Sequence, residues 1–227
     1  YVLGIYDLME RFTSSFPNIL FEGCSGGGGR FDPAILYYSP QIWCSDDTDG
    51  IERLEIQYGT SFFYPISAVG SHVSAIPNHQ TGRRTPLATR GVVAMAGSFG
   101  YEMDLNLLTE DEKEAVKAQV EDYKKYYDLI HNGDYYRLAS PQGDSDYTAW
   151  QFVSGDKTRT LLNLVITHVR ANAPDLWFKL RGLDPEKRYR LEEDGRIYSG
   201  SALMNAGISI PMIMGDYPAV QMVLTEV

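Results

Sequence analysis

Apolar side chains follow two different spacings along the chain, and the spacing changes near Pro141. Before it, stretches with apolar residues at helical spacing alternate with short apolar runs typical of buried strands. The predicted helices cover residues 1–16, 32–39, 49–59, 86–96 and 109–136, and the predicted strands cover 18–25, 41–46 and 68–75, with 97–104 as a strand or a loop. Strands that alternate with helices predict a parallel sheet with crossover helices. Four such units amount to half of a (β/α)8 TIM barrel.

The pattern after Pro141 is that of an antiparallel β domain. Short β-branched and aromatic runs are separated by turns rich in Gly, Asp and Pro, and they cover residues 148–155, 158–169, 176–183, 188–194, 196–200 and 222–227. The segment EEDGR is typical of a hairpin turn. We therefore expect an α/β plus all-β fold: the C-terminal half of a TIM barrel over residues 1–140, then an antiparallel β-sandwich over residues 141–227.

Two helix ends carry clear signals. Thr109 followed by Glu112 has the spacing of a capping box at the start of the longest predicted helix. Pro17 closes the first predicted helix, which begins at Tyr1 without an initiator Met and already has its apolar residues at helical spacing. We interpret the chain as a fragment of something longer.

Composition narrows the class of protein. The hydrophobic content of 44% and charged content of 22% are ordinary for a globular protein, so disorder is excluded. A net charge of -10 argues against nucleic acid or an anionic membrane as a partner, since both need basic surface. No apolar run approaches a membrane span, and the two cysteines are too few for a disulfide framework. A cytoplasmic location is the expectation.

The glycine run in GCSGGGGR invites a phosphate-loop interpretation, which fails. Gly23 and Gly28 have the spacing of that motif, but Arg30 and Phe31 stand where Lys and Ser or Thr are required. A dinucleotide turn also fails, because the long βαβ unit and its acidic ribose partner are missing. What remains is either a flexible turn or a strand end whose bare backbone lets a ligand approach closely.

The acidic cluster SDDTDG invites a calcium interpretation, which fails as well. Position twelve of a calcium loop would be Ile56, where a bidentate Glu is needed. Asp49 is interpreted mainly as the N-cap of the helix that follows. Asp46 ends the preceding strand beside Trp43, and barrels carry their catalytic groups at such strand ends. We expect the indole to desolvate this carboxyl partly, which raises a pKa and suits a general acid.

Histidines and cysteines give no metal site. His72 ends another predicted strand, where it is either a base or hydrogen-bond donor or, as is more usual, a structural residue. The other three histidines have no ligand spacing with each other or with the cysteines. No nucleophilic-serine motif is present. We therefore predict no metal and no cofactor.

Several of these segments together resemble the bacterial α-galactosidases of glycoside hydrolase family 36. The resemblance is carried by CSGGGGRFD, WCSDDTDGIERLEIQYGTS, VGSHVS, GRRTPLATRG and FGYEMDL, and it extends over essentially the whole chain. It implies a retaining glycosidase on a TIM barrel with β domains at both ends, often a tetramer, acting on terminal α-galactosyl groups of melibiose- or raffinose-type oligosaccharides.

The resemblance also implies roles for individual residues. Asp46 would be the acid/base, Cys24 and Gly26 would contact the galactose in subsite −1, and Trp43 would line that subsite. Arg30 would be a supporting residue of the same subsite. Asp47 stands where many members have Asn, a departure to which the sequence assigns no meaning.

One departure concerns the nucleophile. The family's nucleophile is an Asp in a Lys-Trp-Asp motif, and this motif occurs nowhere in the 227 residues. We expect it upstream of Tyr1, in an N-terminal part of the same enzyme that is not in this chain. A retaining mechanism needs two carboxyl groups about 5 to 5.5 Å apart. The chain alone is therefore expected to be inactive.

Two other functions remain open at this point. A galactosyltransferase of the same superfamily, of the raffinose- or stachyose-synthase type, shares the chemistry until the sugar acceptor arrives. The chain is alternatively a non-catalytic carbohydrate-binding fragment or subunit. Product analysis with a sugar acceptor separates the first from hydrolysis, and an in-frame Lys-Trp-Asp upstream separates the second.

Overall fold

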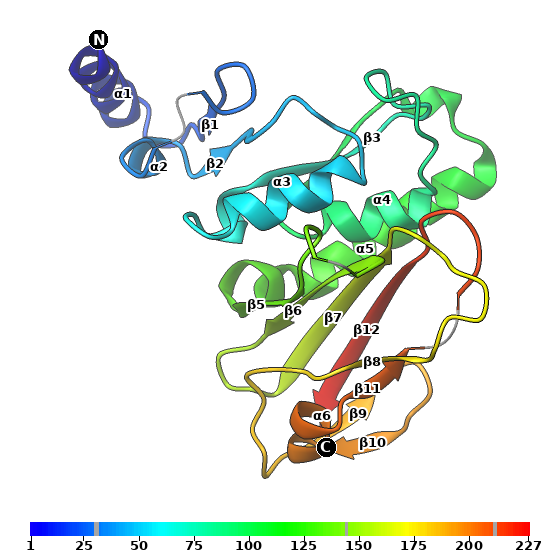
Figure 1. Ribbon diagram of the computed structural model, residues 1–227. Helices are drawn as coiled ribbons and strands as arrows, with labels where there is room; N and C mark the ends of the chain where they lie inside the picture. The colour runs from blue at the N-terminus through cyan, green and yellow to red at the C-terminus, as the bar shows by residue number, and fades with distance from the viewer. Residues whose placement is uncertain (30–31, 144, 211–212) are drawn as a thin grey trace.

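The computed structural model describes residues 1–29, 32–143, 145–210 and 213–227, and its elements form two layers (Figure 1). The first layer alternates helices and short strands. Its elements are α1 (Val2–Ser15), β1 (Glu22–Gly23), α2 (Ile35–Tyr38), β2 (Gln41–Ile42), α3 (Glu52–Thr60), η1 (Ile66–Ala68), β3 (Gly70–Ser74), α4 (Leu87–Ala94), β4 (Ser98–Glu102), η2 (Leu105–Leu107) and α5 (Glu110–Asn132). Among the described residues, no helix has the length and apolar character needed to cross a bilayer.

The short strands of this layer run parallel in chain order. β1 pairs with β2, β3 pairs with β4, and a parallel bridge from Ile42 to Val69 joins the two pairs. Parallel neighbours in chain order, separated by helices, are the arrangement expected of half a barrel. The predicted barrel half is confirmed in its strand order.

Three predicted elements of this layer are shorter than expected. The strand predicted over 18–25 is only two residues long, and Ile19 and Leu20 are 53% and 85% exposed instead of buried. Within the described residues β1 has a strand neighbour only on the β2 side, so nothing covers these side chains. The strand predicted over 41–46 likewise ends at Ile42, and the helix predicted over 32–39 shrinks to α2.

The second layer is antiparallel, as predicted. Its elements are β5 (Asp134–Ala139), β6 (Tyr147–Val153), β7 (Arg159–Ile166), β8 (Leu176–Phe178), β9 (Arg188–Leu191), β10 (Ile197–Ser199), α6 (Gly200–Asn205), β11 (Ile208–Ile210) and β12 (Ala219–Glu226). Six strands form one sheet in the order β10-β9-β12-β7-β6-β5, and β8 pairs with β11 in a second, smaller sheet. Helix α6 is absent from the sequence-based prediction.

The helix predicted over 109–136 ends four residues early. α5 stops at Asn132, and the two tyrosines Tyr135 and Tyr136 belong to β5. Gly133 makes the change of direction, because a Cβ there would lie 2.3 Å from the Leu129 carbonyl oxygen. β5 lies just before residue 140, and the domain division expected there stays a prediction.

The other end of α5 is confirmed in detail. The backbone N–H of Glu112 donates to the Thr109 hydroxyl at 3.2 Å, and the N–H of Thr109 donates to the Glu112 carboxylate at 2.9 Å. These reciprocal bonds satisfy two of the donors that a helix start leaves open. The predicted capping box is therefore present.

The central strand β7 is apolar on both faces. Leu161 and Val165 point toward the helices of the first layer, whereas Leu162 and Leu164 point the other way. Successive side chains of a strand face opposite sides, so a strand buried on both sides reads as a continuous apolar run. This accounts for the five apolar residues of LLNLVI in the middle of the sheet; its one polar residue, Asn163, is buried and accepts from Gln221 at 2.9 Å.

One face of the six-stranded sheet packs against the first layer. The shared cluster joins α3, η1, the start of β3, α4 and α5 to β6, β7 and β12, through Leu54, Ile66, Val69, Val93, Met95, Ala96, Tyr126, Leu129, Ile130, Trp150, Phe152, Leu161, Val165 and Val223. Phe152 is fully buried at its centre. The two layers therefore share one core.

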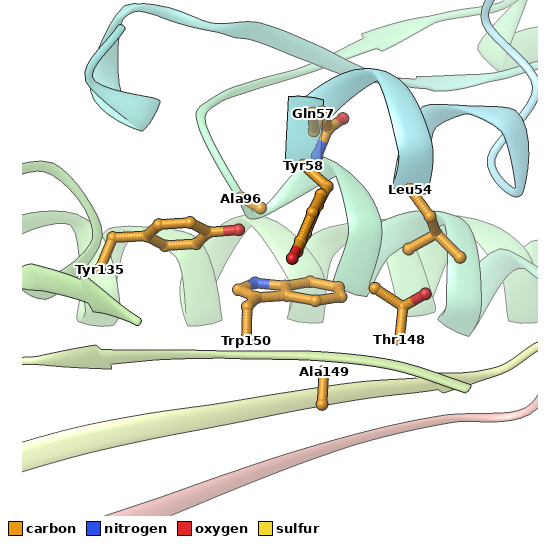
Figure 2. Close-up of a pocket in the computed structure, with 8 residues that line it drawn as sticks. All are labelled: Leu54, Gln57, Tyr58, Ala96, Tyr135, Thr148, Ala149 and Trp150. Atoms are coloured by element: carbon orange, nitrogen blue, oxygen red, sulfur yellow. The ribbon is translucent and has the colours of Figure 1, made fainter. Parts of the chain in front are cut away.

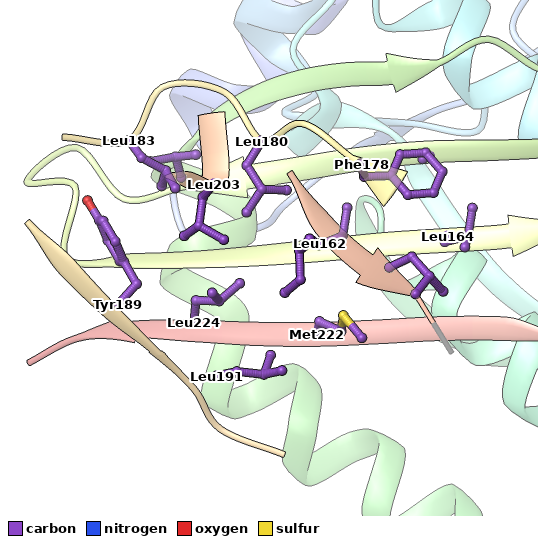
Figure 3. Close-up of a cluster of buried hydrophobic side chains, with 14 of the residues drawn as sticks. Leu162, Leu164, Phe178, Leu180, Leu183, Tyr189, Leu191, Leu203, Met222 and Leu224 are labelled. Atoms are coloured by element: carbon purple, nitrogen blue, oxygen red, sulfur yellow. The ribbon is translucent and has the colours of Figure 1, made fainter. Parts of the chain in front are cut away.

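The opposite face of the sheet packs against the β8–β11 pair and α6. Figure 3 shows Leu162 and Met222 of the large sheet near Phe178 and Leu203 from the covering chain. All four side chains are buried. Two sheets with an apolar layer between them agree with the sandwich that the pattern predicted.

A small cavity remains where α3 meets β6. Tyr58 and Tyr135 reach toward Trp150 from α3 and β5 (Figure 2). The Trp150 indole N–H and the Thr148 hydroxyl are buried there without a hydrogen-bond partner within the described residues. Burial raises the pKa of Tyr135 to about 12, so this phenol stays neutral. This part of the contact between the layers depends on packing, and hydrogen bonds contribute less to it.

The start of α3 is fixed by Asp49, as the sequence predicted. Its carboxylate accepts hydrogen bonds from the backbone N–H groups of Ile51 and Glu52, at 2.8 and 3.2 Å. It also accepts from the Thr81 hydroxyl and forms an ion pair with Arg83. A carboxylate that accepts from the first turn of a helix satisfies open donors and interacts favourably with the helix dipole.

We predict that Phe152→Ala lowers the free energy of unfolding by about 3 to 5 kcal/mol, because it opens a cavity in the core that the two layers share. Denaturant unfolding of the purified protein measures this. Phe63→Ala is the matched control: Phe63 is 85% exposed, and its loss should change stability by about 0.5 kcal/mol or less. Equal midpoints for Phe152→Ala and the wild type would contradict the shared core.

We predict a pH-dependent cost for Asp49→Asn. Burial works to raise the pKa of Asp49, but hydrogen bonds from Thr81, the backbone N–H groups and Arg83 outweigh burial and hold this pKa below its ordinary 3.8. The ionised carboxylate therefore stabilises the fold above pH 3.8, and this stabilisation is lost as the pH falls through the lowered value.

Asp49→Asn should therefore cost about 1.5 to 3 kcal/mol at neutral pH, and the difference from the wild type should shrink toward about pH 3. Denaturant titrations across this range are the measurement. The exposed Asp175→Asn serves as control, with an expected change of about 0.5 kcal/mol or less. A difference that stays constant with pH would show that Asp49 acts through shape alone.

Candidate active site

Four polar side chains, two of them predicted site residues, lie at or near the C-terminal ends of the parallel strands. Cys24 follows β1, Asp46 lies on the turn after β2, His72 lies within β3, and Glu102 ends β4. Because the four strands are parallel neighbours, their C-terminal ends meet at the same edge. The strand-end argument made from the sequence is thereby supported in its geometry.

The glycine run is a tight turn packed against the segment that carries Asp46. Ser25, Gly26, Gly27 and Gly28 all have positive φ, at 121°, 60°, 71° and 90°. A Cβ on Gly27 would lie 2.8 Å from the backbone nitrogen of Asp46, and nothing lies within 4 Å of a Cβ on Gly26. Glycine is therefore required at Gly27 for close backbone contact, whereas the Gly26 position opens onto free space.

The turn is also closed on itself. The N–H of Gly29 donates to the Ser25 carbonyl at 3.0 Å, and a Cβ on Gly28 would lie 3.2 Å from the Cys44 carbonyl oxygen. Of the two interpretations left open by the sequence, the packed strand end fits these contacts better than the flexible turn. Arg30 lies outside the described residues.

Asp46 is exposed and is held by one side-chain contact. The indole N–H of Trp43 donates to its Oδ1 at 3.0 Å. The expectation that the indole would desolvate this carboxyl is wrong for the described residues, since Asp46 stays in contact with solvent. The reason is geometric: the polar edge of the indole meets the carboxylate, and the apolar ring face does not cover it.

Trp43 is itself surrounded by protein. Its ring centroid lies 4.8 Å from that of His72, with 34° between the planes, and 5.5 Å from the guanidinium carbon of Arg53. A Cβ on Gly70 would lie 3.3 Å from the ring, so this glycine leaves room for the indole. The indole is half-buried, which keeps part of it accessible at the strand ends.

Arg53 is a residue that the sequence reasoning missed. It is 2% exposed, and it donates to the Gly70 carbonyl at 2.6 Å and to the Ser45 carbonyl at 3.3 Å. Its Nε donates to Gln57, which in turn donates to the Val93 carbonyl on α4. The available signal was a polar pair at i and i+4, Arg53 and Gln57, on the same helix face as the apolar Leu54.

His72 is half-buried on the same edge. Burial is the main cause that lowers its pKa below 6.5, and it outweighs the nearby carboxylates of Glu102 and Glu22, which act in the opposite direction. The Nδ1 atom lies 4.0 Å from the Glu102 carboxylate. A Cβ on Gly100 would lie 2.9 Å from the imidazole, so the glycine at this position of β4 leaves room for the His72 ring. Near neutral pH, His72 is thus a neutral ring packed at a tilt against Trp43.

The remaining acidic and sulfur side chains have simpler places. Asp47 accepts from the backbone N–H of Asp49 at 2.9 Å and so shapes the turn that leads into α3. Cys24 is exposed, Cys44 is half-buried, and both are free thiols. Within the described part of the chain, no three His, Cys, Asp or Glu side chains are grouped so as to hold a metal ion.

Comparisons with known protein families agree with this arrangement. The family model described as Melibiase matches residues 1–133, and that of the glycosyl hydrolase family 36 C-terminal domain matches residues 147–224. The first match covers more than half of the chain and contains the strand-end cluster.

Individual relatives give the same result. The chain is 55% identical over 226 residues to the bifunctional α-galactosidase/sucrose kinase AgaSK of Mediterraneibacter gnavus, a match that covers 100% of this chain and 24% of the relative. The structure of the galactosidase domain of AgaSK superposes with a TM-score of 0.98 at 55% identity, covering 100% of this chain and 31% of that one.

A variant of the α-galactosidase AgaA from Geobacillus stearothermophilus, solved in complex with raffinose, superposes with a TM-score of 0.96 at 50% identity. That match covers 100% of this chain and 31% of the AgaA chain. The chain thus spans about a quarter to a third of the length of these relatives. By both family models and by these identities, the chain belongs to glycoside hydrolase family 36.

Proposed function

We propose that this chain carries the acid/base part of the active site of a retaining α-galactosidase, and that Asp46 is the acid/base. The observation that carries the proposal is the place of Asp46: an exposed carboxylate on the turn that follows β2, beside Trp43 and next to the packed glycine turn. Family membership adds the expectation of galactoside chemistry.

The proposed reaction has two steps. In the first, the Asp46 carboxyl donates its proton to the glycosidic oxygen while a carboxylate nucleophile forms a bond to the anomeric carbon, and the aglycone leaves as an alcohol. In the second, the Asp46 carboxylate takes a proton from water, which attacks the anomeric carbon and releases galactose and the nucleophile. The acid/base recovers its proton and the configuration is retained.

The nucleophile is proposed to lie outside this chain. The sequence holds no Lys-Trp-Asp motif, and we propose that the preceding part of the same enzyme supplies it. A retaining site needs that carboxylate about 5 to 5.5 Å from the Asp46 carboxyl. The open side of β1 is where a further parallel strand would pair.

Galactose in subsite −1 is proposed to contact Cys24, Gly26 and Trp43, with Arg30 in a supporting role. Gly26 supports this, because the space around it is free and a sugar ring can approach its backbone. Cys24 is exposed beside it, and an accessible indole suits the apolar face of a sugar. The substrates are proposed to be galacto-oligosaccharides of the melibiose and raffinose type.

The wider setting is also proposed. The full-length enzyme would complete the barrel, divide from the β domain near residue 140 and form a homo-oligomer such as a tetramer. The two free thiols are compatible with a reducing cytoplasm. No feature of the described residues favours transfer to a sugar acceptor over hydrolysis.

Asp46→Ala in the full-length enzyme tests the proposal. Hydrolysis of melibiose should fall by about 10²- to 10⁴-fold, because its leaving group needs protonation. An aryl α-galactoside with a good leaving group should still form the covalent intermediate, and azide should restore turnover by giving the α-galactosyl azide.

Asp175→Ala is the control, an exposed Asp in the β domain that should leave both activities unchanged. If Asp46→Ala kept near wild-type activity on melibiose, Asp46 would not be the proton donor.

Gly27→Ala should impair the same enzyme through backbone contact alone. Its Cβ would push against the backbone of Asp46, and a shift of the acid/base should lower kcat/KM on the order of 10²-fold. Gly82→Ala is a matched control, since Gly82 shares the φ of 71° and has nothing within 4 Å of its Cβ. If the two variants lose activity equally, backbone strain explains the loss and the contact does not.

A further inference from the structure

We propose that Trp43 is a positioning residue for Asp46, and that Arg53 and His72 fix the indole for this task. The inference rests on the proposed role of Asp46 as acid/base. It goes beyond the proposed role of Trp43 in lining subsite −1. The contact used here is the hydrogen bond from the indole N–H to the Asp46 carboxylate, and it does not involve the sugar.

The first step is the hydrogen bond itself. Trp43 Nε1 lies 3.0 Å from Asp46 Oδ1, across a turn of only three residues. An indole N–H donates and never accepts. When the carboxyl is protonated, Oδ1 must therefore remain the acceptor, and the proton is carried on Oδ2. The contact selects which oxygen of Asp46 faces the leaving group.

The second step is the exposure of Asp46. Its carboxylate is solvent-exposed, and a free carboxylate on a short turn rotates among several rotamers. Holding Oδ1 removes much of this freedom before the substrate arrives. Proton transfer in the transition state gains from such positioning, because a misplaced group loses most of its effect.

The third step is what fixes the indole. The His72 ring lies 4.8 Å from the indole between centroids, tilted by 34°, and a Cβ on Gly70 would lie 3.3 Å from the benzene part of the indole. Arg53 lies 5.5 Å from the ring and donates to the carbonyls of both Ser45 and Gly70. The guanidinium thus joins the segment after β2, which contains Trp43, to the start of β3.

The burial of Arg53 supports this role. The side chain is 2% exposed and its donors are directed at carbonyl oxygens and Gln57, so it is a fixed part of the scaffold. An exposed guanidinium would change conformation freely in solvent. The buried Arg53 guanidinium instead donates to three acceptors, on Gln57, Ser45 and Gly70. The chain of contacts from Arg53 through Trp43 to Asp46 is continuous.

Trp43→Phe in the full-length enzyme tests the proposal, since it keeps an aromatic ring and removes the N–H donor. We expect roughly a tenfold loss of kcat/KM on melibiose and on aryl galactosides with poor leaving groups. Activated aryl galactosides should change by about twofold or less, because they need little proton donation. The dependence of rate on leaving-group basicity should become steeper, an effect that neither instability nor weaker sugar binding produces.

A double variant decides whether Trp43 acts through Asp46. In an Asp46→Ala background, adding Trp43→Phe should cause no further change in the dependence of rate on the leaving group, because the group that it positions is gone. Trp177→Phe is the matched control, an exposed tryptophan on β8 of the other layer, and it should change no rate. Arg53→Lys should reproduce the leaving-group dependence of Trp43→Phe in a milder form, with the fold checked by circular dichroism.

Three results would overturn the proposal. The first is an equal loss of kcat/KM for all substrates in Trp43→Phe that persists in the Asp46→Ala background, which would make Trp43 a sugar contact only. The second is a Trp43→Phe variant with every rate unchanged, which would make the hydrogen bond irrelevant to turnover. Full melibiose activity of Asp46→Ala would remove the acid/base assignment itself, and this failure is recognised from the single variant without reference to Trp43.

Discussion

The apolar cluster shared by the helices of the first layer and the six-stranded sheet is the contact on which the rest of the structure depends. The parallel strands are too short to hold the first layer together by themselves, since β1 and β2 have two residues each. Helices α3, α4 and α5 instead bury their apolar sides against β6, β7 and β12. Burial of this kind, at about 25 cal/mol per Å² of apolar surface, exceeds what a few ladder hydrogen bonds contribute.

A chain of hydrogen bonds through Gln57 and Arg53 connects this core to the ends of the parallel strands. Gln57 sits at the edge of the shared cluster, donates to the Val93 carbonyl on α4 and accepts from Ser71 on β3. Arg53, one turn earlier on α3, is oriented by donating to Gln57. It also donates to the backbone carbonyls of Ser45 and Gly70, which lie near Trp43. Packing between the layers fixes α3, and α3 fixes the turn that carries Asp46. The β domain thereby contributes to the site without providing a residue to it.

Periodicity and end signals predicted much of this molecule. The βα alternation, the capping box at Thr109, the N-cap at Asp49 and the antiparallel second half all follow from local pattern, because local steric and hydrogen-bond rules determine them. Residues that act at a strand end could be proposed for the same reason, since a parallel sheet brings such ends together. The glycines at Gly27 and Gly28 were recognisable as a close-approach segment, although not what they approach.

The features that could not be predicted from the sequence depend on contacts between segments that are distant along the chain. The continuation of α5 into β5 was misjudged because Tyr135 and Tyr136 continue an amphipathic pattern, although the helix ends at Asn132 and Gly133 follows at a position with no room for a Cβ. The solvent exposure of the Asp46 carboxyl was misjudged, because proximity to Trp43 in the sequence does not show which edge of the indole faces that carboxyl. Arg53 was missed since a charged residue on a helix is ordinarily solvated, and only its three acceptors show otherwise.

The turn that carries Asp46 is held through its backbone, although the carboxylate itself is exposed. The acid/base role proposed for Asp46 needs its carboxyl about 5 to 5.5 Å from the nucleophile, yet Asp46 lies on a turn after a strand of only two residues. Precision must therefore come from neighbours. Gly27 and Gly28 contact the backbone of the turn on one side, and Arg53 holds it to β3 on the other. The bare glycine backbone and the buried cation thus both restrict the turn that carries the proposed proton donor, while its carboxylate stays open to solvent.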